Sequence, residues 1–556
     1  MKYQSVVKTH ASSLLCIVLS AGLMSCTPPN VPPPAKTSSE ATAPAAPAAA
    51  TKTVSAGDVT LTEEEFKKGQ HIYFDRCSGC HGALRKGATG PNITPEKTTK
   101  KTLAKLEKIL YEGTDGGMPG WGKDGFMTEA ETKLMAKYVR LEPPQPPEWG
   151  MKEMKKSWKV HVPVDQRPTE PPAGKNWQNY FGVVERDIGQ ISIIDGDTKK
   201  ILSQIPSGFA THILRTSASM RYMYAIGRDG KASMMDMWAE PPNLVAEVRT
   251  GIDARSIDTS KFKGFEDKYA VVGDYWPPHY VIMEGDTLEP LKVMGTRGYT
   301  YDTNEYHPEP RVASIVASHH APEWVLNLKE TGVVLLVDYS GMENGTVVET
   351  SINAERFLHD GGWDSTKRYF LVAANARDTI SVIDTVERKL VKNIITGTKP
   401  HPGRGANWID PEFGRVWATV HLGEGLVSMI STDPESPKAW TVVREWELGG
   451  NSLFIKTHPN STNVYCDNTI NKDKSNVLTI FDINNPTAAP KEITFKKKVV
   501  HMEYNKAGDE VWISLWDKEG EVVILDDKTL TEKARVTGLD MPTGKFNVYN
   551  TTKDVY

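Results

Sequence analysis

Two cysteines and a histidine at fixed spacing carry the clearest chemistry in this chain. Residues 77–81 read CSGCH, a CxxCH motif in which two thiols can add across porphyrin vinyl groups while the adjacent imidazole reaches the iron. A redox-active pair of thiols is the alternative, but the histidine that follows favours haem attachment. The motif therefore predicts haem c bound covalently through Cys77 and Cys80, with His81 as an iron ligand.

A second iron ligand is expected from a methionine further along the chain. Met118 lies in the segment GGMPGW at residues 116–121, where glycines allow a close backbone approach and the proline prevents a helix. Met127 and Met135 are the alternatives, although Met135 belongs to an apolar helical stripe. We expect Met118 to complete the coordination of the haem c iron. A methionine ligand raises the reduction potential of the haem, which suits a protein that accepts electrons.

Helices must surround such a haem, and the flanking sequence predicts them. Thr62 with Glu65 and Thr128 with Glu131 have the spacing of capping boxes, and each precedes an apolar helical pattern. The run PPQPPEWG at residues 143–150 then breaks regular structure. Residues 54–150 are therefore expected to form a small helical cytochrome c domain and its linker.

The rest of the chain has the sequence pattern of short β-strands. From about Asn179, some eight segments repeat an apolar pair, an Asp-containing turn and a Lys-Leu pair at just under 50 residues, as in ISIIDGDTKKIL and VWISLWDKEGEVVILDDKTL. That spacing is typical of propeller blades, with a β-sandwich pair as the alternative. The predicted fold class is α plus all-β, a helical cytochrome domain followed by a β-propeller over residues 151–556, which the family resemblance described below implies to be eight-bladed.

The N-terminus has the features of an export signal. Lys2 and Lys8 precede an apolar run from Ser12 to Met24 that is too short for a membrane span. The run ends in LMSC, which resembles a lipoprotein signal with Cys26 as the lipidated residue; ordinary cleavage nearby is the alternative. Residues 1–26 are thus a predicted signal, and the Pro/Ala-rich residues 27–53 a predicted flexible tether.

Composition narrows the remaining choices. The formal net charge of −4 argues against a nucleic-acid partner. Of the five cysteines, Cys16 and Cys26 lie in the signal, two form the CxxCH motif, and Cys466 is left alone. We therefore expect no disulfide framework, and Cys466 to be a small buried hydrophobic residue.

The propeller region carries strings that resemble the cytochrome cd1 nitrite reductase family. They occur in family order over about residues 62–556, together with CSGCHGALRKGATGPNITP, GGMPGWG and PPQPPEWGMKEM in the cytochrome half. The strings include YAIGRDGK, ARSIDTSKFKGFEDKY, YHPEPRVASIVASH, FLHDGGWDS, TKPHPGRGAN, SLFIKTHP and PTGKFNVYNT.

The resemblance implies a second, non-covalent cofactor, haem d1, held in the propeller of a homodimer. By position, His212 is the proximal ligand of the d1 iron, and His359 and His401 are the catalytic pair on its distal side. Because haem d1 carries several carboxylates, cations are expected around it. The matching residues are Arg186, Arg215, Arg228, Arg255 and Arg404, with Tyr275 as a hydrogen-bonding neighbour.

The activity implied is denitrifying reduction of nitrite to nitric oxide in the periplasm. A small soluble donor, a cytochrome c or a cupredoxin, would supply electrons through haem c. A haem d1 maturation or carrier protein of the same architecture is the alternative, and a propeller that only docks a partner is a more distant one. Residues 27–70 contain neither Tyr nor His. The chain thus departs from relatives that place such an N-terminal residue at one of the irons.

The local sequence also predicts where the distal histidines lie in the propeller. His401 stands between Pro400 and Pro402, and His359 is followed by Asp-Gly-Gly. Both patterns are typical of turns, so we expect each histidine on a loop rather than in a strand.

Overall fold

The computed structural model describes residues 52–87, 90–114, 118–123 and 125–556. The predicted signal and nearly all of the predicted tether, including Cys26, lie outside these residues. Residues 52–556 form one contact unit. Within the described residues, no helix combines the length and the apolar character that a membrane crossing needs.

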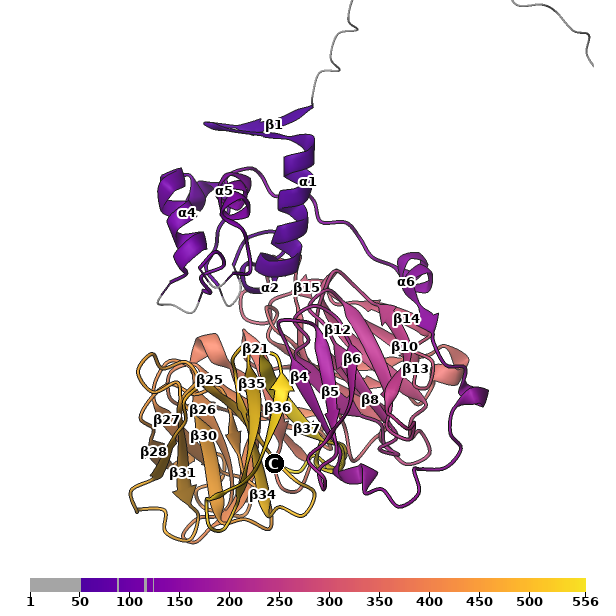
Figure 1. The fold of residues 1–556 in the computed structure, drawn as a ribbon, viewed down its shortest axis with the longest axis vertical. Coiled ribbons are helices and arrows are strands. Elements are labelled where there is room, and N and C mark those ends of the chain that lie inside the picture. The colour runs from indigo at the N-terminus through magenta and orange to yellow at the C-terminus, as the bar shows by residue number, and fades with distance from the viewer. Residues whose placement is uncertain (1–51, 88–89, 115–117, 124) are drawn as a thin grey trace, which may run out of the picture. The chain divides into compact units, whose positions relative to one another are not determined.

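The N-terminal part of this unit is helical, as predicted (Figure 1). Both predicted capping boxes are present, at Thr62 with Glu65 and at Thr128 with Glu131. One π-turn, Tyr73–Cys77, leads directly into the CxxCH motif, and such turns often occur at functional sites. The elements are β1 (Thr53–Ala56), β2 (Val59–Thr62), α1 (Glu63–Ile72), α2 (Ser78–His81), α3 (Pro95–Thr98), α4 (Leu103–Glu112) and α5 (Glu129–Tyr138).

Helices α1 and α5 cross at a glycine. A Cβ placed at Gly69 would lie 2.7 Å from a ring carbon of Tyr138, so only glycine permits this approach. Met135 and Tyr138 of α5 are fully buried in the same core as Ile72 of α1. The predicted apolar stripe of the closing helix therefore packs onto the helix that precedes the CxxCH motif.

The connection to the strands is irregular over residues 142–150, where the sequence predicts a break. It continues through α6 (Met151–Ser157) and β3 (Lys159–Val160), which pairs with the outer strand of a blade. Short 3₁₀ turns occur at Val164–Gln166, Trp177–Asn179, Met342–Asn344 and Asn375–Arg377, and a small hairpin is formed by β15 (Gly298–Tyr299) and β16 (Tyr306–His307).

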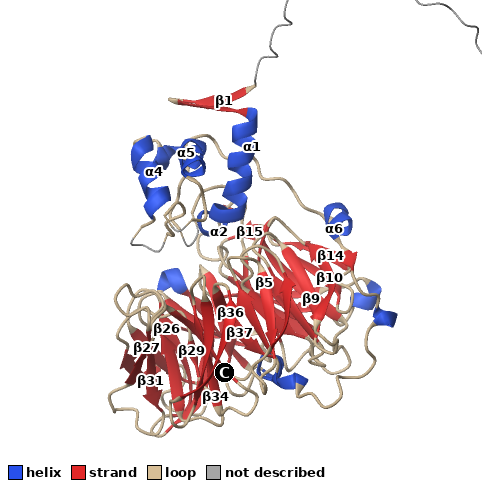
Figure 2. Ribbon diagram, in the orientation of Figure 1, coloured by secondary structure: helices blue, strands red, loops and turns tan. Residues whose placement is uncertain are grey.

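Eight antiparallel blades follow, each built on four strands, which confirms the propeller (Figure 2). In seven blades the strands run in sequence order from the inside outward, and in the eighth β37 is the inner strand before β4, β5 and β6. The first four blades are β37 (Pro542–Asn547), β4 (Phe181–Glu185), β5 (Gln190–Ile194) and β6 (Ile201–Pro206); β7 (Ile213–Thr216), β8 (Tyr222–Ile226), β9 (Lys231–Asp236) and β10 (Asn243–Arg249); β11 (Asp253–Thr259), β12 (Tyr269–Trp276), β13 (His279–Glu284) and β14 (Pro290–Gly295); β17 (Val312–Ala317), β18 (Glu323–Leu328), β19 (Val333–Asp338) and β20 (Val348–Asn353).

The other four blades complete the ring. They are β21 (Leu358–Trp363), β22 (Tyr369–Ala374), β23 (Thr379–Asp384) and β24 (Lys389–Ile395); β25 (Pro400–Asp410), β26 (Gly414–His421), β27 (Leu426–Ser431) and β28 (Val442–Glu447); β29 (Ile455–Lys456), β30 (Asn463–Asp467), β31 (Val477–Asp482) and β32 (Lys491–Thr494); β33 (Val499–Tyr504), β34 (Glu510–Leu515), β35 (Gly520–Asp526) and β36 (Glu532–Leu539).

The repeated sequence pattern has a direct structural cause. Second strands such as β18 and β22 are buried at every residue, because neighbouring blades cover both of their faces, whereas the outer strand β20 is mostly exposed. The repeated aspartates mark the turn after the third strand: Asp195 Oδ1 accepts the backbone N–H of Asp197 at 2.8 Å, and Asp384 Oδ1 accepts that of Val386 at 3.0 Å.

The ring is closed by strands from its two ends. Strand β37 pairs antiparallel with β4, with Phe546 opposite Gly182. Helix α7 (Val548–Lys553) then carries the chain to Tyr556, whose hydroxyl accepts the backbone N–H of Trp363 at 2.9 Å. The C-terminal residue is thereby held against the inner strand of another blade.

Candidate functional site

The inner strands of all eight blades surround one cavity of about 330 Å³. This lies within the usual size range of ligand pockets. Three histidines singled out from the sequence line it, His212, His359 and His401. Residues from segments almost 200 positions apart are thus brought to one site.

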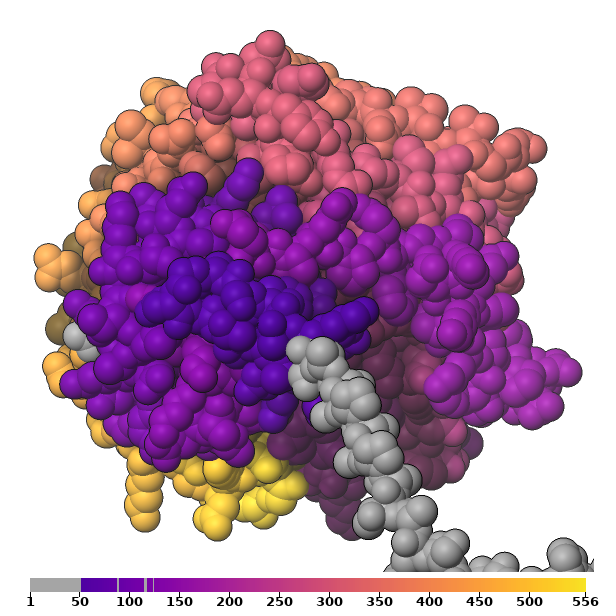
Figure 3. Space-filling view, turned by 90° about the horizontal axis from the view of Figure 1, so that it is seen from above, coloured from indigo at the N-terminus to yellow at the C-terminus, as the bar shows by residue number. Residues whose placement is uncertain are grey.

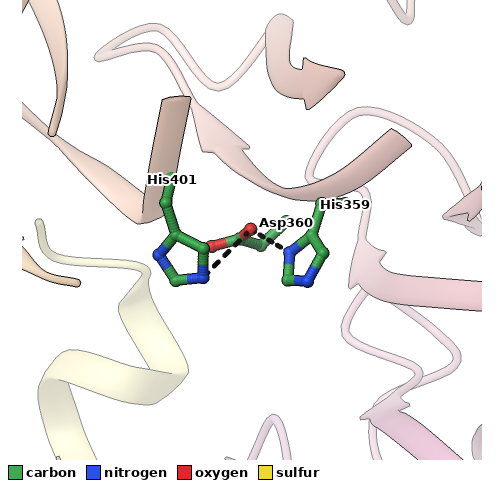
Figure 4. Close-up of side chains that lie close together, drawn as sticks. All are labelled: His359, Asp360 and His401. Carbon is green, nitrogen blue, oxygen red and sulfur yellow. Dashed lines mark hydrogen bonds and ion pairs between the residues drawn. The ribbon is translucent and has the colours of Figure 1, made fainter. Parts of the chain in front are cut away.

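His359 and His401 share a carboxylate between them (Figure 4). Oδ1 of Asp360 is hydrogen-bonded to Nδ1 of His359 and lies 3.8 Å from Nε2 of His401. The two imidazole ring centroids are 5.2 Å apart. Both histidines are buried, with less than a tenth of each side chain exposed.

The prediction that these histidines lie on loops is wrong. His359 belongs to β21 and His401 to β25, the inner strands of adjacent blades. Each strand has a break in register at the histidine, between Leu358 and Gly361 and between His401 and Ala406. The Gly and Pro residues form bulges instead of loops, since an inner strand is an edge strand that tolerates proline, and bulges turn side chains toward an active site.

Burial and positive charge act on the cavity histidines. The pKa of His359 is lowered to about 3 by burial and then by the nearby Lys329. Burial, followed by Arg255, Arg186 and Arg228, places the pKa of His212 well below its usual range. His212 is therefore neutral, which is the form that ligates a metal.

The cavity carries an excess of positive charge. Five Arg and Lys side chains line it against three carboxylates. Four of them are predicted site residues, Arg186, Arg215, Arg255 and Arg404, and Lys456 is the fifth. Among the described residues, the buried Nη1 of Arg404 has no hydrogen-bond partner. Burial, together with Arg404, lowers the pKa of Arg215 to about 9.

Such a cavity fits a polyanion. The three atoms contributed by His359, Asp360 and His401 lie within 4.8 Å of one another, close enough to hold a metal ion. The surrounding cations disfavour a free divalent cation at that point. They favour a planar ligand with several carboxylates, whose charge would satisfy the arginines.

Arg228 and Tyr275, the other two predicted shell residues, lie toward the cytochrome domain and are not part of the cavity lining. Arg228 forms a two-point ion pair with Asp253, with Nε–Oδ1 and Nη2–Oδ2 distances of 2.8 and 2.9 Å. Its guanidinium lies over the ring of Tyr275, 5.0 Å from the centroid. Their predicted contact with haem d1 stays a prediction.

The same ion pair touches the CxxCH motif. Oγ of Ser78 donates to Asp253 Oδ2 at 3.3 Å, and the backbone N–H of Ala83 donates to the carboxylate of Glu309 at 2.8 Å. Seen from above, the indigo cytochrome residues lie against the propeller (Figure 3). The segment with the two cysteines is thus held directly on the propeller.

The cytochrome site itself has the groups that a covalent haem needs. Neither Cys77 nor Cys80 forms a disulfide, so both sulfur atoms are available for covalent attachment of the haem. Nδ1 of His81 lies 2.8 Å from the carbonyl of Pro91, so Nδ1 donates and Nε2 is left for an iron. Met118 packs half-buried against the core of this domain. Its role as the second ligand stays a prediction.

The sequence did not single out several residues that the fold brings to the cavity. Asp360 follows His359 directly, and the FLHDGG string already contained it. His501, Lys456 and Tyr556 line the cavity from other blades and the C-terminus. Only their positions, on inner strands or at the end of the chain, could have indicated that they line the cavity. Identifying inner strands from the sequence requires knowing which strand of each blade a segment forms. Cys466 is fully buried in an apolar cluster, which confirms its predicted character.

Fold and site together define a class of protein: a c-type cytochrome joined to an eight-bladed propeller whose cavity suits an anionic macrocycle. The family described as "Cytochrome D1 heme domain" matches residues 175–551, and "Cytochrome C oxidase, cbb3-type, subunit III" matches residues 64–139. The chain belongs to the cytochrome d1 haem domain family.

Its relatives agree with this assignment. The chain is 48% identical over 535 residues to a nitrite reductase of Stutzerimonas stutzeri, covering 89% of this chain and 95% of the relative. It is 25% identical to a dihydro-haem d1 dehydrogenase of Pseudomonas aeruginosa, covering 87% and 94%. A solved structure titled "Dihydro-heme d1 dehydrogenase NirN in complex with DHE" superposes with a TM-score of 0.68 at 25% identity, covering 87% and 99%. Haem c and haem d1 are accordingly the cofactors of this chain, as predicted.

Proposed function

We propose that this protein is a nitrite reductase that converts nitrite, one electron and two protons into nitric oxide and water. The observation that carries the proposal is the buried pair of His359 and His401 around one carboxylate, in a cavity that also contains a neutral histidine and an excess of cations. The 48% identity to a nitrite reductase over nearly its whole length supports it.

Each group has a role in this reaction. When bound, haem d1 supplies the iron at which nitrite is reduced, and haem c supplies the electron. His212 would hold the d1 iron from one side, while Arg186, Arg215, Arg255 and Arg404 bind its carboxylates and attract the nitrite anion. His359 and His401 would hold and deliver protons to the nitrite oxygen that leaves as water.

The alternative, a haem d1 maturation or carrier protein, has less support than the reductase, because the identity to a nitrite reductase is 48% whereas the identity to a dihydro-haem d1 dehydrogenase is 25%. One assay separates the two: purified protein containing both haems is given reduced cytochrome c and nitrite, and nitric oxide is measured directly. We expect catalytic formation of nitric oxide. Many electrons consumed without nitric oxide, or a single turnover only, would refute the reductase.

Several finer features belong to the same proposal. The protein acts in the periplasm in denitrification, works as a homodimer, and takes electrons from a small soluble cytochrome c or cupredoxin. Cys26 becomes the lipidated N-terminus, with residues 27–53 as the tether, and the cytochrome and propeller domains comprise residues 54–150 and 151–556. Intact-mass analysis of the mature protein tests the anchor, because a start downstream of Cys26 contradicts it.

A further inference from the structure

One carboxylate oxygen serves both distal histidines. Oδ1 of Asp360 accepts from Nδ1 of His359 and also lies 3.8 Å from Nε2 of His401 (Figure 4). The side chain of Asp360 comes from the bulge in β21, next to His359 in sequence. The bulge therefore turns two successive side chains, and not only the histidine, toward the neighbouring blade.

The second ring is fixed by a backbone carbonyl. Nδ1 of His401 lies 2.8 Å from the carbonyl oxygen of Leu453, which can only accept, so Nδ1 must carry a proton. In a neutral ring Nε2 is then a bare acceptor that faces a carboxylate oxygen, which is unfavourable. A proton placed between Nε2 and that carboxylate oxygen would turn this into an attraction, so the contact is a point at which the distal pair can hold a proton.

Several cations surround the distal pair, and Asp360 is the carboxylate in contact with both of its rings. The charged and titratable groups around the carboxylate are His359, His401, Lys329, Arg255 and, across the cavity, Arg404 and His212. Lys329 is itself buried, with its amine lacking a hydrogen-bond partner among the described residues, and burial followed by Arg311 lowers its pKa to about 7. The two histidines hold the pKa of Asp360 below its usual range.

We propose that Asp360 is the positioning residue of the distal pair: it orients both rings through one oxygen and favours a proton at its contact with Nε2 of His401. The inference rests on the proposed function, since it names what allows a buried, cation-surrounded histidine pair to act as an acid. Asp360 remains a carboxylate throughout, and the transferred proton leaves an imidazole nitrogen for a nitrite oxygen. Without Asp360 the pair loses the carboxylate oxygen that orients both rings and favours that proton.

Asp360→Asn tests this in the enzyme loaded with both haems. Nitrite turnover is expected to fall ~10²-fold, as for loss of a general acid, while the haem d1 content stays unchanged. The alkaline limb of the pH profile is expected to move at least one unit toward acid. Asp360→Glu should restore part of the turnover and part of the wild-type pH profile. Asp433→Asn, at an exposed ion pair with Arg415, is the matched control and should leave turnover unchanged.

A second readout does not depend on turnover. Nitrite binding to the oxidised protein is titrated through the visible spectrum of haem d1 across pH. Wild-type affinity should weaken roughly tenfold per pH unit above the pKa of the distal pair, as it does when binding is linked to one proton. In Asp360→Asn this dependence should disappear. An unchanged dependence in a variant with full haem d1 overturns the proposal.

A failure of the Asp360 proposal can be distinguished from a failure of the proposed reductase function. If the wild type binds nitrite but forms no nitric oxide, the reductase assignment fails, and the binding titration still tests Asp360. If Asp360→Asn does not retain haem d1, Asp360→Glu replaces it in the titration. The longer side chain must then shift the pH dependence of binding, and a wild-type curve from this variant overturns the proposal.

Discussion

Arg228 of the propeller lies directly on Gly79, the glycine between the two cysteines of the CxxCH motif. A Cβ at Gly79 would be 2.0 Å from Nη2 of Arg228. The guanidinium cannot move away freely, because Asp253 binds it at two points. The peptide that carries haem c therefore contacts an arginine whose charge also lowers the pKa of His212.

Gly79→Ala should disrupt the contact between the CxxCH motif and Arg228. Overpacking of this kind costs about 1–3 kcal/mol, and the displaced arginine loses its ion-pair geometry. We expect haem c to attach normally, but reduction of haem d1 by haem c, followed by stopped-flow absorbance, to slow. Gly295→Ala is the control, because a Cβ there meets no atom within 4 Å. Equal rates in both variants would show that the contact does not position the haems.

Removing either distal histidine should reduce turnover and leave folding intact. His359→Ala and His401→Ala each remove a proton-bearing ring, and such losses cost ~10²–10⁴-fold in rate. Steady-state nitrite reduction measures the effect, with the haem c spectrum as the check on folding. Near-normal turnover by the double variant, with haem d1 fully loaded, would exclude the histidines as proton donors.

His212→Ala should have a different consequence, namely loss of haem d1. Its neutral ring is the candidate iron ligand in the cavity, and the arginines alone provide charge without a metal bond. We expect a haem d1 to haem c ratio far below that of the wild type after purification, measured by pyridine haemochrome and extraction. His320→Ala, at a residue outside the cavity lining, should keep the full ratio. Full haem d1 content in His212→Ala would point to another ligand.

Glu309 should make the protein less stable as the pH rises. Burial raises its pKa from 4.5 to about 7, so the folded state binds the proton more tightly than the unfolded state does. The stabilisation is complete below about pH 4.5 and is lost as the pH passes 7, by up to about 3 kcal/mol. Glu309→Gln mimics the protonated form and should remove this loss. Chemical denaturation at pH 5 and pH 8 measures it, and an equal pH dependence in both proteins contradicts it.

Features that depend on neighbours in the chain were predictable from the sequence. The CxxCH motif, the capping boxes at Thr62 and Thr128, and the Asp turns after third strands are each closed by hydrogen bonds or covalent chemistry within a few residues. The blade repeat follows as well, because a strand covered on both faces must be apolar along its whole length. A propeller was therefore predictable from spacing, and the family resemblance added that it has eight blades.

The arrangement of the site was decided only by the tertiary structure. Asp360 meets His401, 41 positions away, because β21 and β25 are inner strands of adjacent blades and both bulge at their histidines. The ion pair of Arg228 with Asp253, beside Gly79, joins residues from three separate segments of the chain. Local sequence specifies that glycine and proline will break a strand. Only the ring of blades, closed by β37 against β4, determines which side chains those breaks turn toward each other.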